Sequence, residues 1–151
     1  MFQRLMSTLA LTLLTGMLWA QDMQENMVIP DTFADTKVVL QISDPNPFKQ
    51  TLILNVASNL LKYYGDTSKV DIEVVAFGPG ARLLIKNNAN TPRIKKLMGS
   101  GIRFSICNNT LTNFSKKLGY QPEVIEGVRI VPAGAVRILE LNKHGWLTLK
   151  P

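Results

Sequence analysis

The stretch "KVVLQIS", residues 37–43, decides the fold class. Its apolar residues follow one another with little alternation, and β-branched residues are frequent among them. A strand with one face in water alternates apolar and polar side chains, whereas a strand buried on both faces does not. Burial on both faces is typical of a parallel sheet that lies between layers of helices. We therefore interpret residues 37–43 as an inner strand of an α/β protein.

The rest of the chain alternates helical and strand-like patterns. An apolar residue recurs at every fourth position from Phe48 to Tyr64, which predicts an amphipathic helix that Gly65 ends. Further strands are predicted over 70–77, 102–107, 126–131 and 146–151, and further helices over 81–88, 91–101, 108–119 and 132–145. Strands and helices that alternate in this way predict a mainly parallel sheet of about five strands, with helices on both faces.

Three helix ends carry local signals. We expect Thr91 to cap the helix over 91–101 and Pro92 to occupy its first position. Pro132 is expected to open the last helix in the same way, and Gly119 to close the helix over 108–119.

The amino-terminal residues are interpreted apart from the domain. Residues 1–20 contain one positive charge, Arg4, then an apolar run to Leu18 and a small residue, Ala20. This pattern predicts a cleaved secretory signal peptide, and the alternative is an uncleaved anchor. Residues 21–36 are polar and are expected to form a loose arm, and residues 37–151 a single domain. We therefore expect a periplasmic or secreted protein that has no stable membrane insertion after cleavage.

Composition narrows the choice of function. The chain has 151 residues, 46% hydrophobic and 19% charged, which suits a globular domain with a core. Its net charge is +6, but the basic residues are scattered and no aromatic residues are interleaved with them. Nucleic-acid binding is therefore not expected.

The candidate site lies where strands end, because ligands of open α/β sheets bind beyond the carboxyl ends of the strands. Cys107, the sole cysteine, ends a predicted strand, and a helix is expected to begin with Asn108, Asn109 and Thr110. Backbone N–H groups and the helix dipole at that point favour an anion, and such a cysteine can have its pKa lowered from about 8.5 to roughly 3.5–7.5. The alternative is that Cys107 is an inert core residue. The residues by themselves do not decide between a reactive thiol and an inert core residue.

Two other turns could let a ligand approach the backbone. One contains Gly78 and Gly80, in "FGPG", and the other contains Pro132 and Gly134, in "PAGA". A plain turn and a plain helix start explain these residues equally well. The single histidine, His144, is placed at a helix end and is not expected to act as a base for Cys107. No zinc site and no dinucleotide-binding fingerprint are apparent.

Four segments together resemble the DsrE-like sulfur-relay superfamily, in particular its exported, single-cysteine branch. They are "KVVLQISD", "VDIEVVAFGPGARLL", "GIRFSICNNTL" and "VRIVPAGAVRILELNKHGWLTLKP". The resemblance covers about residues 37–151. It implies a flavodoxin-like three-layer sandwich, assembled as a trimer or hexamer.

The resemblance also implies a function. Cys107 matches the position that carries sulfur as a persulfide in the relay proteins, and Asn109 and Thr110 match an adjacent "NT" pair. The expected activity is at most that of a sulfurtransferase-like carrier, with unidentified sulfur donors and acceptors as partners. Thiol exchange of this kind requires no metal or organic cofactor. The alternative is a non-catalytic oligomeric module that binds a small ligand and has a structural cysteine.

Overall fold

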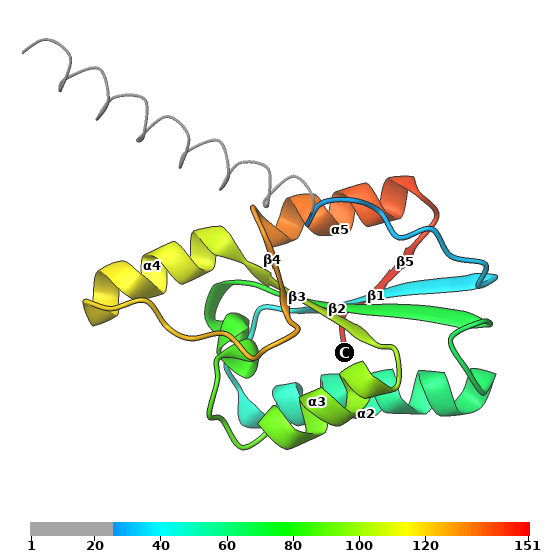
Figure 1. Ribbon diagram of the computed structural model, residues 1–151, viewed down its shortest axis with the longest axis horizontal. Helices are drawn as coiled ribbons and strands as arrows, with labels where there is room; N and C mark the ends of the chain where they lie inside the picture. Colours follow the sequence, from blue (N-terminus) through cyan, green and yellow to red (C-terminus); the bar gives the residue numbers. More distant parts are fainter. Residues whose placement is uncertain (1–25) are drawn as a thin grey trace, which may run out of the picture.

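The computed structural model describes residues 26–151, and Figure 1 shows a central sheet between layers of helices. The strands are β1 (Thr36–Ile42), β2 (Val70–Ala76), β3 (Arg103–Cys107), β4 (Arg129–Val131) and β5 (Leu147–Leu149). The helices are α2 (Pro47–Tyr64), the 3₁₀ helix η1 (Gly78–Leu84), α3 (Thr91–Gly99), α4 (Asn108–Leu118) and α5 (Gly134–Lys143).

The sheet confirms the predicted fold class. Its five strands have the order β4-β3-β2-β1-β5, and every neighbouring pair is parallel. Figure 1 shows α2 and α3 below the sheet and α5 above it. This is the three-layer, flavodoxin-like sandwich that the alternating pattern and the resemblance predicted.

The inner strands β1 and β2 are mainly apolar because both of their faces are covered. All seven residues of β2 are buried. The larger core cluster packs one face of the sheet against α2 and α3 and includes Leu54, Ile94 and Phe104. A smaller cluster on the opposite face joins Val39 and Val75 to α5 and Trp146. The two clusters cover both faces of the inner strands, as the apolar runs in the sequence predicted.

Several element ends differ from the predictions. The segment "ARLLIKNN" was expected to be helical over 81–88, but the helix is of the 3₁₀ type and spans Gly78–Leu84. Ile85 instead forms an antiparallel bridge with Val124, so the backbone beyond η1 pairs across to another segment. Strand β4 begins three residues later than expected, because Gly127 turns the chain with a φ of +87°.

Two predicted helix starts are also corrected. Asn90, rather than Thr91, occupies the cap position of α3. Helix α5 begins at Gly134 and not at Pro132, because the intervening Ala133 is extended, with φ −144° and ψ 126°. Gly65 and Gly119 end their helices as predicted.

The segment before β1 is packed rather than loose in the part that the structure describes. The backbone carbonyl groups of Met27 and Val28 accept hydrogen bonds from Arg137, at 3.0 and 3.1 Å. Ile29 packs against the smaller core cluster, and Ala34 is buried. These contacts hold the segment on the α5 side of the sheet. The predicted signal peptide and residues 21–25 lie outside the described residues.

No helix in the described part of the chain is long and apolar enough to cross a membrane.

Candidate functional site

The carboxyl edge of the sheet gathers the sequence-predicted site residues. The last residues of β1 and β2, Ile42 and Ala76, are paired, and Ala76 pairs with Ile106 of β3. Cys107 pairs with Val131, the last residue of β4. Four strand-to-helix turns therefore lie next to one another, as the rule for open α/β sheets requires.

Cys107 lies at the junction between β3 and α4. It is the last residue of the strand and also the cap residue of the helix, with extended backbone angles. Its side chain makes no capping hydrogen bond. The thiol side chain is buried, with 6% of the residue surface exposed. The helix therefore begins directly at the thiol.

The residues expected to cap α4 lie inside it instead. Asn108, Asn109 and Thr110 form its first turn, because the strand runs into the helix without a linker and the cap position falls on Cys107. Asn108 is half-buried and Asn109 is exposed. The backbone N–H of Asn109 donates to the carbonyl of Pro132, at 3.4 Å, which ties this turn to the turn after β4.

Thr110 links the turn after β3 to the turn after β2. Its hydroxyl accepts a hydrogen bond from the backbone N–H of Gly78, at 2.9 Å, and the residue is buried. The "NT" pair therefore bridges Cys107 to both neighbouring turns, Asn109 through its backbone and Thr110 through its hydroxyl.

The glycines of the "FGPG" turn serve close packing in this structure. The N–H of Gly80 donates to the carbonyl of Ser43, at 3.0 Å. A β-carbon on Gly80 would lie 2.8 Å from backbone atoms of Ile42 and Ser43. The backbone that approaches Gly80 is thus that of the turn after β1, and the N–H groups of Gly78 and Gly80 both donate within the protein.

Gly134 has a similar role at the start of α5. A β-carbon there would lie 2.9 Å from the β-carbon of Phe77. Pro132 precedes the helix by two residues and accepts the hydrogen bond from Asn109. All eight predicted site residues are therefore at the same edge of the sheet, and hydrogen bonds join Gly78 to Thr110 and Asn109 to Pro132.

His144 lies at the opposite edge. It follows α5 as its cap residue, and its Nδ1 is 2.8 Å from the carbonyl oxygen of Glu140. Its own carbonyl accepts a hydrogen bond from Lys37, near the start of β1. The fold therefore does not bring the imidazole to Cys107. Among the described residues, no group of three or more histidine, cysteine, aspartate or glutamate side chains could hold a metal ion.

A buried polar layer beneath α5 escaped the sequence analysis. Glu73 accepts hydrogen bonds from Ser105, at 2.7 Å, and from Arg137, at 2.8 Å. Arg103 pairs with Asp71 on the neighbouring strand and lies over the Trp146 ring, 5.3 Å from its centroid. The sequence did contain a signal for this layer, namely Asp71 and Glu73 in the otherwise apolar strand 70–77. Residues two apart in a strand lie on the same face, so both carboxylates had to be buried together.

Burial and pairing act in opposite directions on Glu73. Burial raises the pKa of a carboxyl group, whereas the hydrogen bonds and charge of Arg137, the Ser105 hydroxyl and the charge of Arg103 lower it. The partners prevail, and the pKa of Glu73 lies below its usual value. The carboxylate is therefore held in its charged form inside the protein.

Comparison with known proteins supports the fold. No family model matches the sequence, and no curated protein matches it closely enough to be counted as a relative. The structure is similar to that of a protein of unknown function, MTH1491, from Methanobacterium thermoautotrophicum, with a TM-score of 0.68 and 29% sequence identity. The match covers 78% of this chain and 100% of that chain.

Proposed function

We propose that this protein is an exported sulfur carrier of the DsrE-like type, which holds sulfur as a persulfide on Cys107. One observation carries the proposal: β3 passes without a linker into α4, so the thiol lies at the amino end of an 11-residue helix. The helix dipole and the backbone N–H groups of a first turn favour a negative charge there. Both the thiolate and the persulfide carry that charge.

The carrier reaction consists of two thiol exchanges. The Cys107 thiolate attacks the terminal sulfur of a donor persulfide, polysulfide or thiosulfate, and an S–S bond forms on Cys107. The S–S bond of the donor breaks, and the donor leaves as a thiolate, a shortened polysulfide or sulfite, respectively. An acceptor thiolate then attacks the outer sulfur, the new S–S bond breaks, and the Cys107 thiolate is restored. Sulfur moves without any net oxidation or reduction, so no additional oxidant is required.

The burial of Cys107 favours a second candidate. With 6% of its surface exposed, the residue is packed as a small hydrophobic side chain would be. In that case the protein is a ligand-binding module of the same fold, and Cys107 only fills the junction between β3 and α4.

Intact mass spectrometry separates the two functions. The purified protein is incubated with polysulfide or with thiosulfate, and the mass is compared with that of Cys107→Ser treated identically. A carrier gains the mass of whole sulfur atoms, loses it when a thiol acceptor is added, and shows neither change in Cys107→Ser. A thiol that remains unmodified in the folded protein, but reacts once the protein is unfolded in urea, would support the structural cysteine instead.

From the resemblance to DsrE-like proteins we further propose that the protein assembles as a homo-oligomer, a trimer or a hexamer. From the amino-terminal sequence pattern we propose that it does so in the periplasm or outside the cell. Light scattering coupled to size-exclusion chromatography measures the assembly, and a monomer at all concentrations would contradict it. The amino-terminal sequence of the exported protein tests the predicted cleavage after residue 20.

A further inference from the structure

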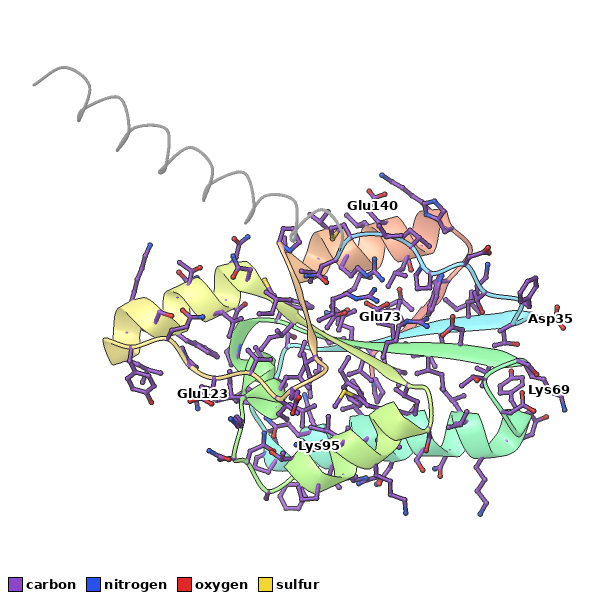
Figure 2. All side chains as sticks on the ribbon, in the orientation of Figure 1. Asp35, Lys69, Glu73, Lys95, Glu123 and Glu140 are labelled. Atoms are coloured by element: carbon purple, nitrogen blue, oxygen red, sulfur yellow. The ribbon has the colours of Figure 1, made fainter. Side chains whose placement is uncertain are left out.

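A groove lies between α4 and η1, away from Cys107. Its walls are η1 with the following residues 85–88 on one side, and the second half of α4 with residues 120–123 on the other. Its volume is about 680 Å³, which falls within the range of small-molecule sites. Figure 2 labels Glu123, which lies on the segment that connects α4 to β4.

Backbone hydrogen bonds hold the two walls together. The N–H of Lys86 donates to the carbonyl of Glu123, at 2.8 Å, and the N–H of Ile125 donates to the carbonyl of Leu84, at 3.0 Å. The side-chain amide of Asn88 donates to backbone carbonyl groups within its own wall. The groove is therefore formed before any ligand arrives, which lowers the cost of binding.

The charge of the groove is positive. Arg82, Lys86 and Lys117 line it, against a single carboxylate, that of Glu123. Glu123 is already paired with Lys86, at 2.7 Å. Within the described part of the chain, neither Arg82 nor Lys117 forms an ion pair. Two positive charges are thus available at the groove.

The remaining lining is largely apolar. Phe114 is half-buried against the core, whereas Leu118 and Tyr120 are 52% and 64% exposed. Exposed apolar side chains that gather at a cavity are typical of a binding site. A ligand with an apolar body would cover them and would leave its charged end near Arg82 or Lys117.

We propose that this groove binds a small organic anion that has an apolar body and a carboxylate or sulfonate group. One chain supplies all the residues that line the groove, and Cys107 is not among them. The groove therefore adds a ligand site to the protein whether or not Cys107 carries sulfur.

The test uses two fluorescent probes of the same shape and different charge. Anilinonaphthalene sulfonate is an aromatic anion, and phenylnaphthylamine is its uncharged analogue. Each probe is titrated with the wild-type protein and with the double variant Arg82→Gln, Lys117→Gln. We expect the variant to bind the sulfonate roughly tenfold more weakly, as the loss of two exposed ionic contacts would cause. Its binding of the neutral probe should remain unchanged.

A control variant matches the change in net charge. Lys62→Gln, Lys69→Gln removes two positive charges from exposed positions on α2 and before β2, and Figure 2 shows Lys69 at the far end of the molecule from Glu123. It should bind both probes as the wild type does. Tyr120→Ser should lower the affinity for both probes, because it removes exposed apolar surface without opening the core. Cys107→Ser should leave the affinity for both probes unchanged.

Three results would overturn the proposal. One is the absence of saturable sulfonate binding to the wild type. Another is equal affinity for the sulfonate in wild type and in Arg82→Gln, Lys117→Gln. The third is an equal loss of affinity in the control variant, which would show that only the overall charge of the protein attracts the probe. Circular dichroism is the control that checks whether every variant is folded.

Discussion

Arg137 and Glu73 form a two-point ion pair inside the fold. The Nε–Oε1 and Nη2–Oε2 distances are both 2.8 Å, and neither side chain has exposed surface. The same guanidinium donates through Nη1 to the backbone carbonyl groups of Met27 and Val28. The Arg137 side chain therefore links α5 to β2 and to the segment before β1.

Removal of Arg137 should destabilise the protein strongly. Arg137→Met would leave the Glu73 carboxylate buried without its main partner, and such a change typically costs about 3–5 kcal/mol. We expect that loss in the free energy of unfolding, measured in urea. The double variant Glu73→Leu, Arg137→Met should lose less, because it removes the carboxylate that Arg137→Met alone leaves without its main partner. A loss below about 1 kcal/mol for Arg137→Met would contradict this prediction.

The same pair predicts how stability depends on pH. The folded pKa of Glu73 lies below the usual value of 4.5. The pair therefore stabilises the folded state above that value, and this contribution is lost as the pH falls below 4.5 through the lower folded pKa. Urea unfolding at a series of pH values measures the profile, and Glu73→Gln serves as the comparison. The stability of Glu73→Gln should fall less steeply below pH 4.5 than that of the wild type. Parallel profiles for the two proteins would show that Glu73 is not the group responsible.

Gly80 should not tolerate alanine. The added β-carbon would lie 2.8 Å from backbone atoms of the β1 turn, which cannot move as a flexible side chain could. We expect Gly80→Ala to lower the free energy of unfolding by about 1–3 kcal/mol. Gly99→Ala is the matched control, because nothing lies within 4 Å of its β-carbon position at the end of α3. There alanine should be neutral or stabilise by up to about 1 kcal/mol.

The Thr110–Gly78 hydrogen bond can be tested by two substitutions. Thr110→Val keeps the shape of the side chain but leaves the N–H of Gly78 without its acceptor, and it should cost about 1–3 kcal/mol. Thr110→Ser keeps the hydroxyl and should cost less. Thermal unfolding measures both. If the bond also positions α4 beside the thiol, Thr110→Val should change the rate at which Cys107 reacts with polysulfide, and Thr110→Ser should not.

Much of the architecture follows from local patterns. The apolar runs 37–43 and 70–77 identified inner strands, and the four-residue period from Phe48 to Tyr64 identified α2. The errors lie at element ends such as Gly78–Leu84 and Gly134. There the chain conformation depends on a neighbour distant in sequence, namely Ser43 for Gly80 and Phe77 for Gly134.

The sequence by itself determined the layered α/β class and placed Cys107 at the end of a strand, because hydrophobic periodicity and helix-end residues act locally. Only the tertiary structure decided what surrounds that thiol. It showed that Thr110 and Gly80 tie the turns together, that Arg137 pairs with Glu73, and that α4 and η1 enclose a positively charged groove. Each of these contacts joins residues far apart along the chain, and their proximity depends on how the strands are ordered in the sheet.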